Sequence, residues 1–352
     1  MAAPADYLDA KDLQNVTAGG LIREDVLDEI FDCSDIPTPF LDMIATDSIS
    51  SEYSEWTEDK LASPSTTNKV VSGSDRASTD NDATLTNAKR VGNHAQISTK
   101  EVFVTERGNN VDVIGRADEM GYQTARRLIE LRYDVEASCL ANLASVQDDN
   151  NATAGQSAGM PAWLTTNTSV GATATAGGFN TTTKLVAARG TGTARGLTWT
   201  LLSAQIEAVY ILGGMPTIVM SIPGMTKRLA QYLFTTAYAA APTANVTGTG
   251  TGVNQTSQGF IDSFKTDFGF HMEIIPNRLQ QGYGGSNINC DLFGIDTRYW
   301  KLGLLYGWKV EPLAKLGLSN RKMLHVDWML KCLLERANFM VADLISTTAV
   351  VA

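Results

Sequence analysis

The feature that most restricts the fold is a proline-free segment with helical spacing of its apolar residues, RADEMGYQTARRLIELRYDVEASCLANLASVQ at 116–147. As one helix rising about 1.5 Å per residue, it would be on the order of 48 Å long, well beyond the average of about three turns. Acidic residues at 118–119 suit the helix start, and the polar run at 148–150 marks its end. The apolar positions predict one narrow buried stripe, and a rod of this kind usually spans something larger than its own domain. The stripe consists of Met120, Leu128, Leu131, Val135, Cys139, Leu143 and Val146.

The composition predicts a folded protein without a metal centre. The 352 residues are 43% hydrophobic, which is enough for a proper core. A basic stretch followed by an apolar run is absent at the N-terminus, and no 18-residue apolar window occurs, so we expect no secretion signal and no membrane span. The expected compartment is therefore the cytoplasm. Four cysteines and three histidines are scattered singly, which predicts reduced buried thiols and neither a metal site nor a cofactor.

The charge is concentrated in the first 60 residues. They hold 15 acids and three bases, a balance of −12, so the other 292 residues carry about +2 of the whole-chain −10. A sequence-specific nucleic-acid reader would show a basic stripe, and the sequence has none. A nearly neutral body is compatible with non-specific proximity to packaged nucleic acid.

The segment between the acidic arm and the long helix reads as an extended hairpin. An acidic helix is expected at 21–31, before the prolines at 37 and 39, and SSEYSEW then predicts a strand. Residues 62–93 are too polar to form a core, and AQISTKEVFVT reads as a second strand. Residues 52–104 are therefore predicted to form a long hairpin that rests on another molecule, because a loop of this length is unusual inside a compact domain.

The second half of the chain alternates helices and strands. A helix is expected at 197–212, a buried strand at 217–221, and a second helix opened by Pro223. Residues 150–196 are a stretch rich in Thr, Gly and Ala, and 239–259 is predicted to be a surface loop. Apolar residues alternate at 302–310 and again at 324–334, around a turn at 317–320. They predict two long antiparallel strands with one buried face, which the long helix could cover.

Motifs for catalysis are weak. GQSAG at 155–159 matches the G-x-S-x-G of serine hydrolases, but no buried strand precedes it, so Ser157 as a nucleophile stays a remote alternative. The glycine runs at 190–192 and 248–252 lack nucleotide-binding spacing. We therefore expect no enzymatic activity and no cofactor.

Charged residues on the hairpin and on the long helix are the candidate functional residues. A solvated helix face with weak ion pairs is the simpler interpretation of the helix charges. The more specific interpretation is that these charges contact the extended loop of a neighbouring subunit. The candidate inter-subunit contacts are Glu52, Glu55, Trp56, Lys69, Arg76, Arg116, Glu119, Arg126, Arg127, Glu130 and Arg132.

The order of these segments resembles the major capsid proteins of tailed bacteriophages, which share the Hong Kong 97-like fold. Residues 116–142 look like the long spine helix of that family, followed by GMPAWLTTN at 159–167. TDFGFHMEIIPNR and DLFGIDTRYWKLGLLYGWKVEPLAKLG resemble its axial strands and the return to the peripheral sheet, so the likeness covers most of 20–340. It implies an α+β fold in four parts. These are an N-terminal arm (1–51), an extended loop (52–104), a peripheral domain with the spine helix (105–165 and 297–346), and an axial domain (166–296).

The resemblance also implies a function. The chain would assemble with itself, as hexamers and pentamers, into an icosahedral shell around a double-stranded DNA genome. A separate scaffolding protein is implied because no long coiled-coil prefix is present, and a portal protein and a cement protein are further candidate partners. The expected location is the virion, with the host cytoplasm during assembly and no membrane. Two alternatives besides the hydrolase are an encapsulin-type nanocompartment shell of the same fold and a Thr- and Gly-rich surface adhesin.

Overall fold

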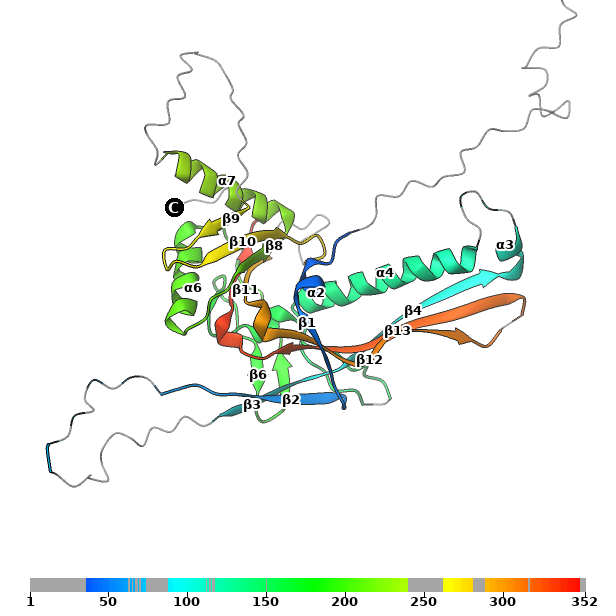
Figure 1. The fold of residues 1–352 in the computed structure, drawn as a ribbon, viewed down its shortest axis with the longest axis horizontal. Helices are drawn as coiled ribbons and strands as arrows, with labels where there is room; N and C mark the ends of the chain where they lie inside the picture. Colours follow the sequence, from blue (N-terminus) through cyan, green and yellow to red (C-terminus); the bar gives the residue numbers. More distant parts are fainter. Residues whose placement is uncertain are drawn as a thin grey trace, which may run out of the picture.

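The computed structural model contains two large β-sheets side by side, with a long helix lying along one of them (Figure 1). The acidic helix expected at 21–31 and nearly all of the loop at 239–259 lie outside the described residues. Within the described part of the chain, no helix is both long and apolar enough to cross a membrane. The structure describes residues 36–62, 64, 66, 69, 71–73, 88–111, 113, 115, 118–149, 151–239, 262–280, 289–315 and 317–348, without the side chains of 234–239.

The first sheet contains the predicted C-terminal hairpin, in the strand order β1-β12-β13-β4. β12 and β13 pair antiparallel, and Gly317 adopts a φ of +71° at the turn between them. β4 continues the antiparallel pairing on β13, and β1 adds a parallel edge on β12. The bounds are β1 (Ala45–Ser48), β4 (Gln96–Thr105), β12 (Trp300–Leu313) and β13 (Ser319–Cys332).

The long helix, α4 (Glu119–Leu140), lies over β13 of the hairpin that it was expected to cover, and over β4, which was not predicted to be its partner. It has 22 residues, about 33 Å, so the prediction of a helix to residue 147 is wrong. Asp118 caps its start by accepting the amides of Met120 and Gly121. Tertiary contacts end it early, because Asn142 bonds the backbone of Arg189 and residues 145–146 pair with other segments.

The predicted buried faces are only partly correct. On α4, Leu128 is 37% exposed, whereas Leu131, Val135 and Cys139 are buried. On β12, Tyr306 and Val310 are both more than 40% exposed, because α4 covers β4 and β13 and does not cover this outer half of β12.

The extended hairpin is shorter than the predicted 52–104. β2 (Tyr53–Glu58) pairs with β3 (Lys89–His94) in a separate two-stranded ladder. β4 was expected to be the second arm of this hairpin, which is wrong, because its partner is β13. Two short helices accompany this region, α2 (Pro39–Met43) before β1 and α3 (Glu106–Asn110) after β4.

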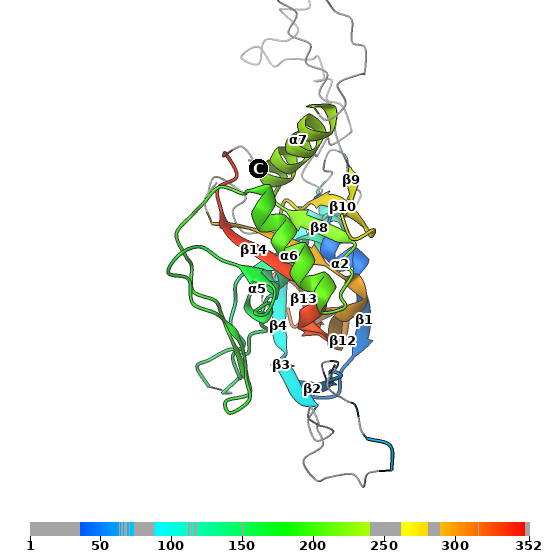
Figure 2. The ribbon, with the colours of Figure 1, turned by 90° about the vertical axis from the view of Figure 1, so that its left-hand side faces the viewer.

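The second sheet has six strands in the order β5-β14-β11-β8-β10-β9. It confirms the predicted helix near 197–212, now α6, the buried strand β8 and the proline-opened helix α7. α6 ends where Gly213 takes a φ of +86°. Figure 2 shows α6 across the side of the molecule that carries this sheet. The bounds are β5 (Thr168–Ser169), α6 (Trp199–Ile211), β8 (Ile218–Ser221), α7 (Pro223–Ala239), β9 (Ser263–Lys265), β10 (His271–Pro276), β11 (Cys290–Ile295) and β14 (Phe339–Leu344).

One core joins the two sheets. Alternate residues of β8 point to opposite sides, so Ile218 and Met220 pack with the first sheet and α4, whereas Val219 packs under α6 and α7. The connection from α4 back to the second sheet crosses this junction. It contains α5 (Met160–Trp163) and the small ladder of β6 (Gly178–Asn180) with β7 (Leu185–Ala187).

Candidate assembly surfaces

The base of the β2–β3 hairpin, where its strands meet the body of the subunit, is held by contacts within the same chain. The Trp56 indole donates to the carbonyl of Cys332 at 2.7 Å, and its ring lies 5.4 Å from that of Trp163. Asn93, fully buried, donates from Nδ2 to the Leu330 carbonyl at 2.8 Å. Trp56, a predicted inter-subunit contact, therefore has an internal anchoring role.

Charged groups surround this base. Glu55 forms ion pairs with Arg90 at 3.2 Å and with Lys184 at 3.5 Å. Burial, together with the Glu55 carboxylate, raises the pKa of Tyr53 to about 12. Glu52 accepts the Asp148 amide at 3.3 Å, and it stays half exposed. The hairpin therefore leaves the body from a base that is both packed and ion-paired.

At the far end of the described hairpin the β3 strand is open to solvent, whereas Glu58 of β2 is partly buried. Lys89 and Arg90 are exposed, in contrast to the buried residues 91–94 at the other end of β3. Lys69, another predicted contact, is also exposed. Arg76 and Arg116 lie outside the described residues.

The charged side of α4 is held mainly by contacts within the chain. Arg127 pairs with Glu130 one turn on, and Arg132 pairs with Asp42 of α2. These side chains are a third or more exposed, so each pair adds only tenths of a kcal/mol. The remaining two candidate residues of this helix also have neighbours on it: Glu119 accepts from Gln123, and Arg126 lies 5.8 Å from the Tyr122 ring.

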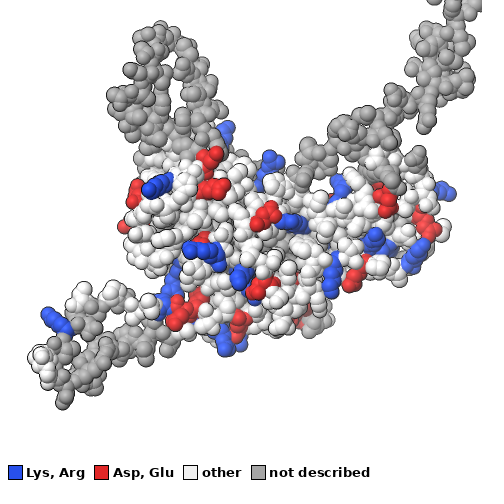
Figure 3. All heavy atoms as spheres, in the orientation of Figure 1, with Lys and Arg blue, Asp and Glu red and all other residues white. Residues whose placement is uncertain are grey.

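Acidic and basic side chains alternate over the body. On the face drawn in Figure 3 they are interspersed, without a continuous stripe of one sign. This distribution fits contact with another protein better than a tight grip on nucleic acid.

A buried carboxylate joins three segments that are remote in sequence. Glu136 of α4 accepts the Phe40 and Leu41 amides at 3.0 and 2.8 Å, and it accepts Asn277 Nδ2 at 2.6 Å. Burial raises the pKa of Glu136, and these three hydrogen bonds oppose the shift. The residue thereby fixes α2 and the end of β10 to the C-terminal part of the long helix.

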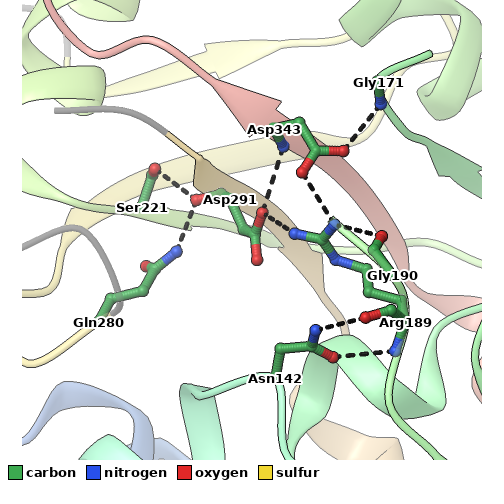
Figure 4. Close-up of polar contacts among 8 residues, drawn as sticks. All are labelled: Asn142, Gly171, Arg189, Gly190, Ser221, Gln280, Asp291 and Asp343. Atoms are coloured by element: carbon green, nitrogen blue, oxygen red, sulfur yellow. Dashed lines mark hydrogen bonds and ion pairs between the residues drawn. The ribbon is translucent and has the colours of Figure 1, made fainter. Parts of the chain in front are cut away.

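A second buried network ties the segment after β7 to the six-stranded sheet (Figure 4). Arg189 contacts Asp291 of β11 at 2.7 Å and Asp343 of β14 at 3.0 Å, and all three side chains are at least 96% buried. Asp343, whose φ is +59°, also accepts the Gly171 amide at 2.8 Å. Asn142, just after α4, donates to the Arg189 carbonyl and accepts from the Arg189 amide, so the network links the end of α4 to the six-stranded sheet.

Ser157 has a structural role. Its hydroxyl is 1% exposed and accepts from Asn93 Nδ2 at 3.1 Å and from the Leu330 amide at 3.0 Å. No imidazole is among its hydrogen-bond partners within the described residues. A nucleophile needs an adjacent base and access to substrate, so the arrangement gives no support to the serine-hydrolase alternative.

Sequence reasoning missed the buried polar residues. Glu136 follows Val135 on the buried side of the predicted helix, so an acid next to an apolar stripe was a usable signal. For Arg189, Asp291 and Asp343 no such signal exists, because they are 52 or more residues apart and meet only through the sheet order.

Comparison with known protein families identifies the family of this chain. Residues 10–345 match the family model described as SU10 major capsid protein. The chain belongs to this family. This capsid protein is a structural, non-enzymatic component of a tailed-phage virion, and it assembles with itself into a lattice. A search of curated proteins finds no match.

Solved capsids show the same fold at low sequence identity. The capsid protein of cyanophage A-1(L) is 13% identical with a TM-score of 0.56, covering 95% of this chain and 99% of the other. That of cyanophage P-SCSP1u is 14% identical with a TM-score of 0.53, covering 96% and 99%. The SrpI encapsulin of Synechococcus elongatus is 9% identical with a TM-score of 0.55, covering 95% and 97%. The α+β fold is therefore the Hong Kong 97-like capsid fold, as expected from the sequence.

Proposed function

We propose that this capsid protein forms hexamers and pentamers of an icosahedral shell that encloses a double-stranded DNA genome. Heterologous contacts repeated around a rotation axis close into rings, which suits these capsomers. Support comes from membership in a major capsid family and from the likeness to assembled phage capsids.

The observation that carries the proposal is the β2–β3 hairpin. It belongs to neither large sheet, it is anchored through Trp56 and Asn93, and it exposes residues 88–90 of its second strand. An isolated two-stranded hairpin is marginal in water, so a projecting one gains stability by resting on another molecule. We infer that this molecule is the next subunit, with the charged side of α4 as the surface it crosses.

The domain division follows the family layout. We propose an arm at 1–51, an extended loop at 52–104, a peripheral domain at 105–165 and 297–346, and an axial domain at 166–296. The pairing of β4 with β13 argues for moving the end of the loop to residue 95. The six-stranded sheet would be the core of the axial domain, completed by β14 from the C-terminal segment.

We propose three further protein partners for the assembly of the shell. A separate scaffolding protein would set the shell size in the host cytoplasm, a portal protein would occupy one vertex, and a cement protein could brace the outside. Packaged DNA would be met by the body without sequence-specific contacts, in keeping with the mixed charges of its visible face (Figure 3).

Electron microscopy with light scattering on the purified chain tests the proposal. We expect rings or megadalton shells, and a stable monomer under all conditions, including with a co-expressed scaffold, would overturn it. The nucleic-acid content of particles from infected cells separates the two shell functions. Genome-length DNA supports a phage capsid, whereas enzyme cargo without DNA would favour an encapsulin-type compartment.

A further inference from the structure

The two ends of the six-stranded sheet differ in chemistry. β8 and β10 run parallel, so the residues that precede them lie at one end of the sheet and those that follow lie at the other. The turns at 212–216 and 266–270 therefore share the first end. The start of α7 and the segment 277–280 share the second.

The first end exposes a contiguous group of apolar side chains, which we call the apolar end. The Tyr210 and Phe268 rings stack at 4.7 Å with an interplanar angle of 18°, which joins the two turns into one surface. Soluble monomers rarely leave such a surface uncovered. The exposed fractions are 73% for Ile211, 49% for Met215, 48% for Leu212, 41% for Tyr210 and 37% for Phe268.

Acidic residues border the apolar end. Glu207 precedes Ile211 by one helical turn on the exposed side of α6, Asp267 adjoins Phe268, and Glu273 is level with the start of β8. All three are exposed, and Lys265 is the base nearest to them in the strand pairing. The border is therefore acidic on balance.

The exposed charged residues of the two segments at the second end are all basic, and we call it the basic end. Lys227 and Arg278 are exposed and Arg228 is half-buried, while residues 222–239 and 276–280 contain no acid. Within the described part of the chain none of the three bases forms an ion pair. Exposed Pro276 and half-buried Leu279 add apolar surface beside them.

We propose that the apolar end of one copy of this chain packs against the basic end of the next copy around each ring. The inference rests on the proposed ring assembly and identifies which axial surfaces meet in it. A heterologous contact needs two different faces on one subunit, and opposite ends of one rigid sheet supply them. The apolar residues would supply the buried centre, and the opposed charges would fix its orientation.

Lysine substitution tests the apolar centre. The I211K/M215K double variant places positive charge opposite the basic end, and lysine after a helix C-terminus is compatible with the helix dipole, so the subunit stays folded. We expect at least a tenfold loss of rings and shells by light scattering, with an unchanged melting temperature. The matched control I211L/M215L keeps the apolar surface and should assemble like the wild type.

A charge-swap experiment decides the pairing without relying on the apolar residues. Reversal of the acids (E207K/D267K) and reversal of the bases (K227E/R228E/R278E) should each reduce assembly, and their combination in one chain should restore it. Failure of the combination to recover, or normal shells from I211K/M215K, overturns this inference alone. A wild-type chain that never assembles overturns the proposed function as well. Wild-type-like shells that lose only an added scaffold or cement protein would assign the apolar end to that protein instead.

Discussion

Glu136 and Arg189 are buried charges that meet partners from segments far away in sequence. Glu136 accepts two backbone amides of α2 and the side-chain amide of Asn277, and Arg189 bridges two neighbouring strands of the six-stranded sheet. Loss of one partner from a buried charged pair costs about 3–5 kcal/mol, whereas an exposed pair on α4 contributes about 0–1 kcal/mol. The relative placement of the two sheets therefore depends on these few interior residues more than on the many surface charges.

Glycine is required on β11 where the ring of Phe339 from the neighbouring strand lies against its backbone. A Cβ on Gly294 of β11 would lie 1.9 Å from the ring of Phe339, which is fully buried and cannot move aside cheaply. We expect Gly294→Ala to lower the free energy of unfolding by about 1–3 kcal/mol. Gly307→Ala in β12 is the matched control, because no atom lies within 4 Å of its Cβ position, and it should change stability by less than about 0.5 kcal/mol. Urea denaturation followed by tryptophan fluorescence measures both, and equal effects would contradict the packing argument.

The buried thiols make stability depend on alkaline pH. Burial raises the pKa of Cys139 and Cys332 well above their ordinary value of 9.0. The unfolded chain therefore loses these protons first, so the stability they contribute is complete below pH 9 and is lost as the pH rises through the folded pKa. We expect the urea midpoint to fall above pH 9, and less so in a Cys139→Ala/Cys332→Ala variant.

Thiol labelling gives an independent measurement. Cys139, Cys290 and Cys332 should resist iodoacetamide in the folded protein and react in urea, as read by mass spectrometry. Rapid labelling of any of the three in the native protein would show that its site opens.

At the scale of helices and strands, capping residues and apolar periodicity predicted which elements exist better than they predicted where each element ends. Gly213 and Pro223 sit at the helix end and helix start that their chemistry favours, and the alternation at 324–334 identifies β13. The end of α4 could not be predicted, because Asn142 leaves the helix to bind a segment 47 residues away. The partner of β4 was equally hidden, since a strand pattern states which face is buried and not which strand lies beside it.

Asp118 gives a direct test of how α4 begins. Its carboxylate accepts the Met120 and Gly121 amides at 3.2 and 3.1 Å, which satisfies two of the unpaired donors at the helix start. We expect Asp118→Ala to reduce stability by about 1 kcal/mol. Asp118→Asn keeps an accepting oxygen and is the matched control, with a loss of a few tenths. An alanine variant as stable as the asparagine variant would show that the cap is replaced by other contacts.

At the scale of the whole molecule, the subunit combines a rigid plate with a projecting hairpin. The core shared by both sheets makes the plate, and β2 and β3 lie below β6 at the lower edge of the body in Figure 1. In the assembly that we propose, one subunit contacts its neighbour by two routes, through the hairpin and through the apolar end. Many modest contacts of this kind, each reversible alone, add up to a stable closed lattice.

A variant with a shortened hairpin tests whether the hairpin is needed for assembly but not for folding of the subunit. Deletion of residues 62–87 joins β2 to β3 through 59–61 and residue 88, a four-residue connection that suits an antiparallel hairpin. Because Trp56 and Asn93 hold the base to the body, we expect the subunit to keep its melting temperature within a few degrees. It should nevertheless fail to make closed shells, because the shortened hairpin no longer extends to the neighbouring subunit.

A second variant, in which a Gly/Ser segment of equal length replaces 62–87, tests whether the length of the hairpin is enough for assembly without its side chains. We expect open or unstable particles from it, since the side-chain contacts with the neighbour are missing. Electron microscopy of the three chains gives the answer, and normal particles from the deletion would show that the lattice closes through the axial and peripheral surfaces without the loop.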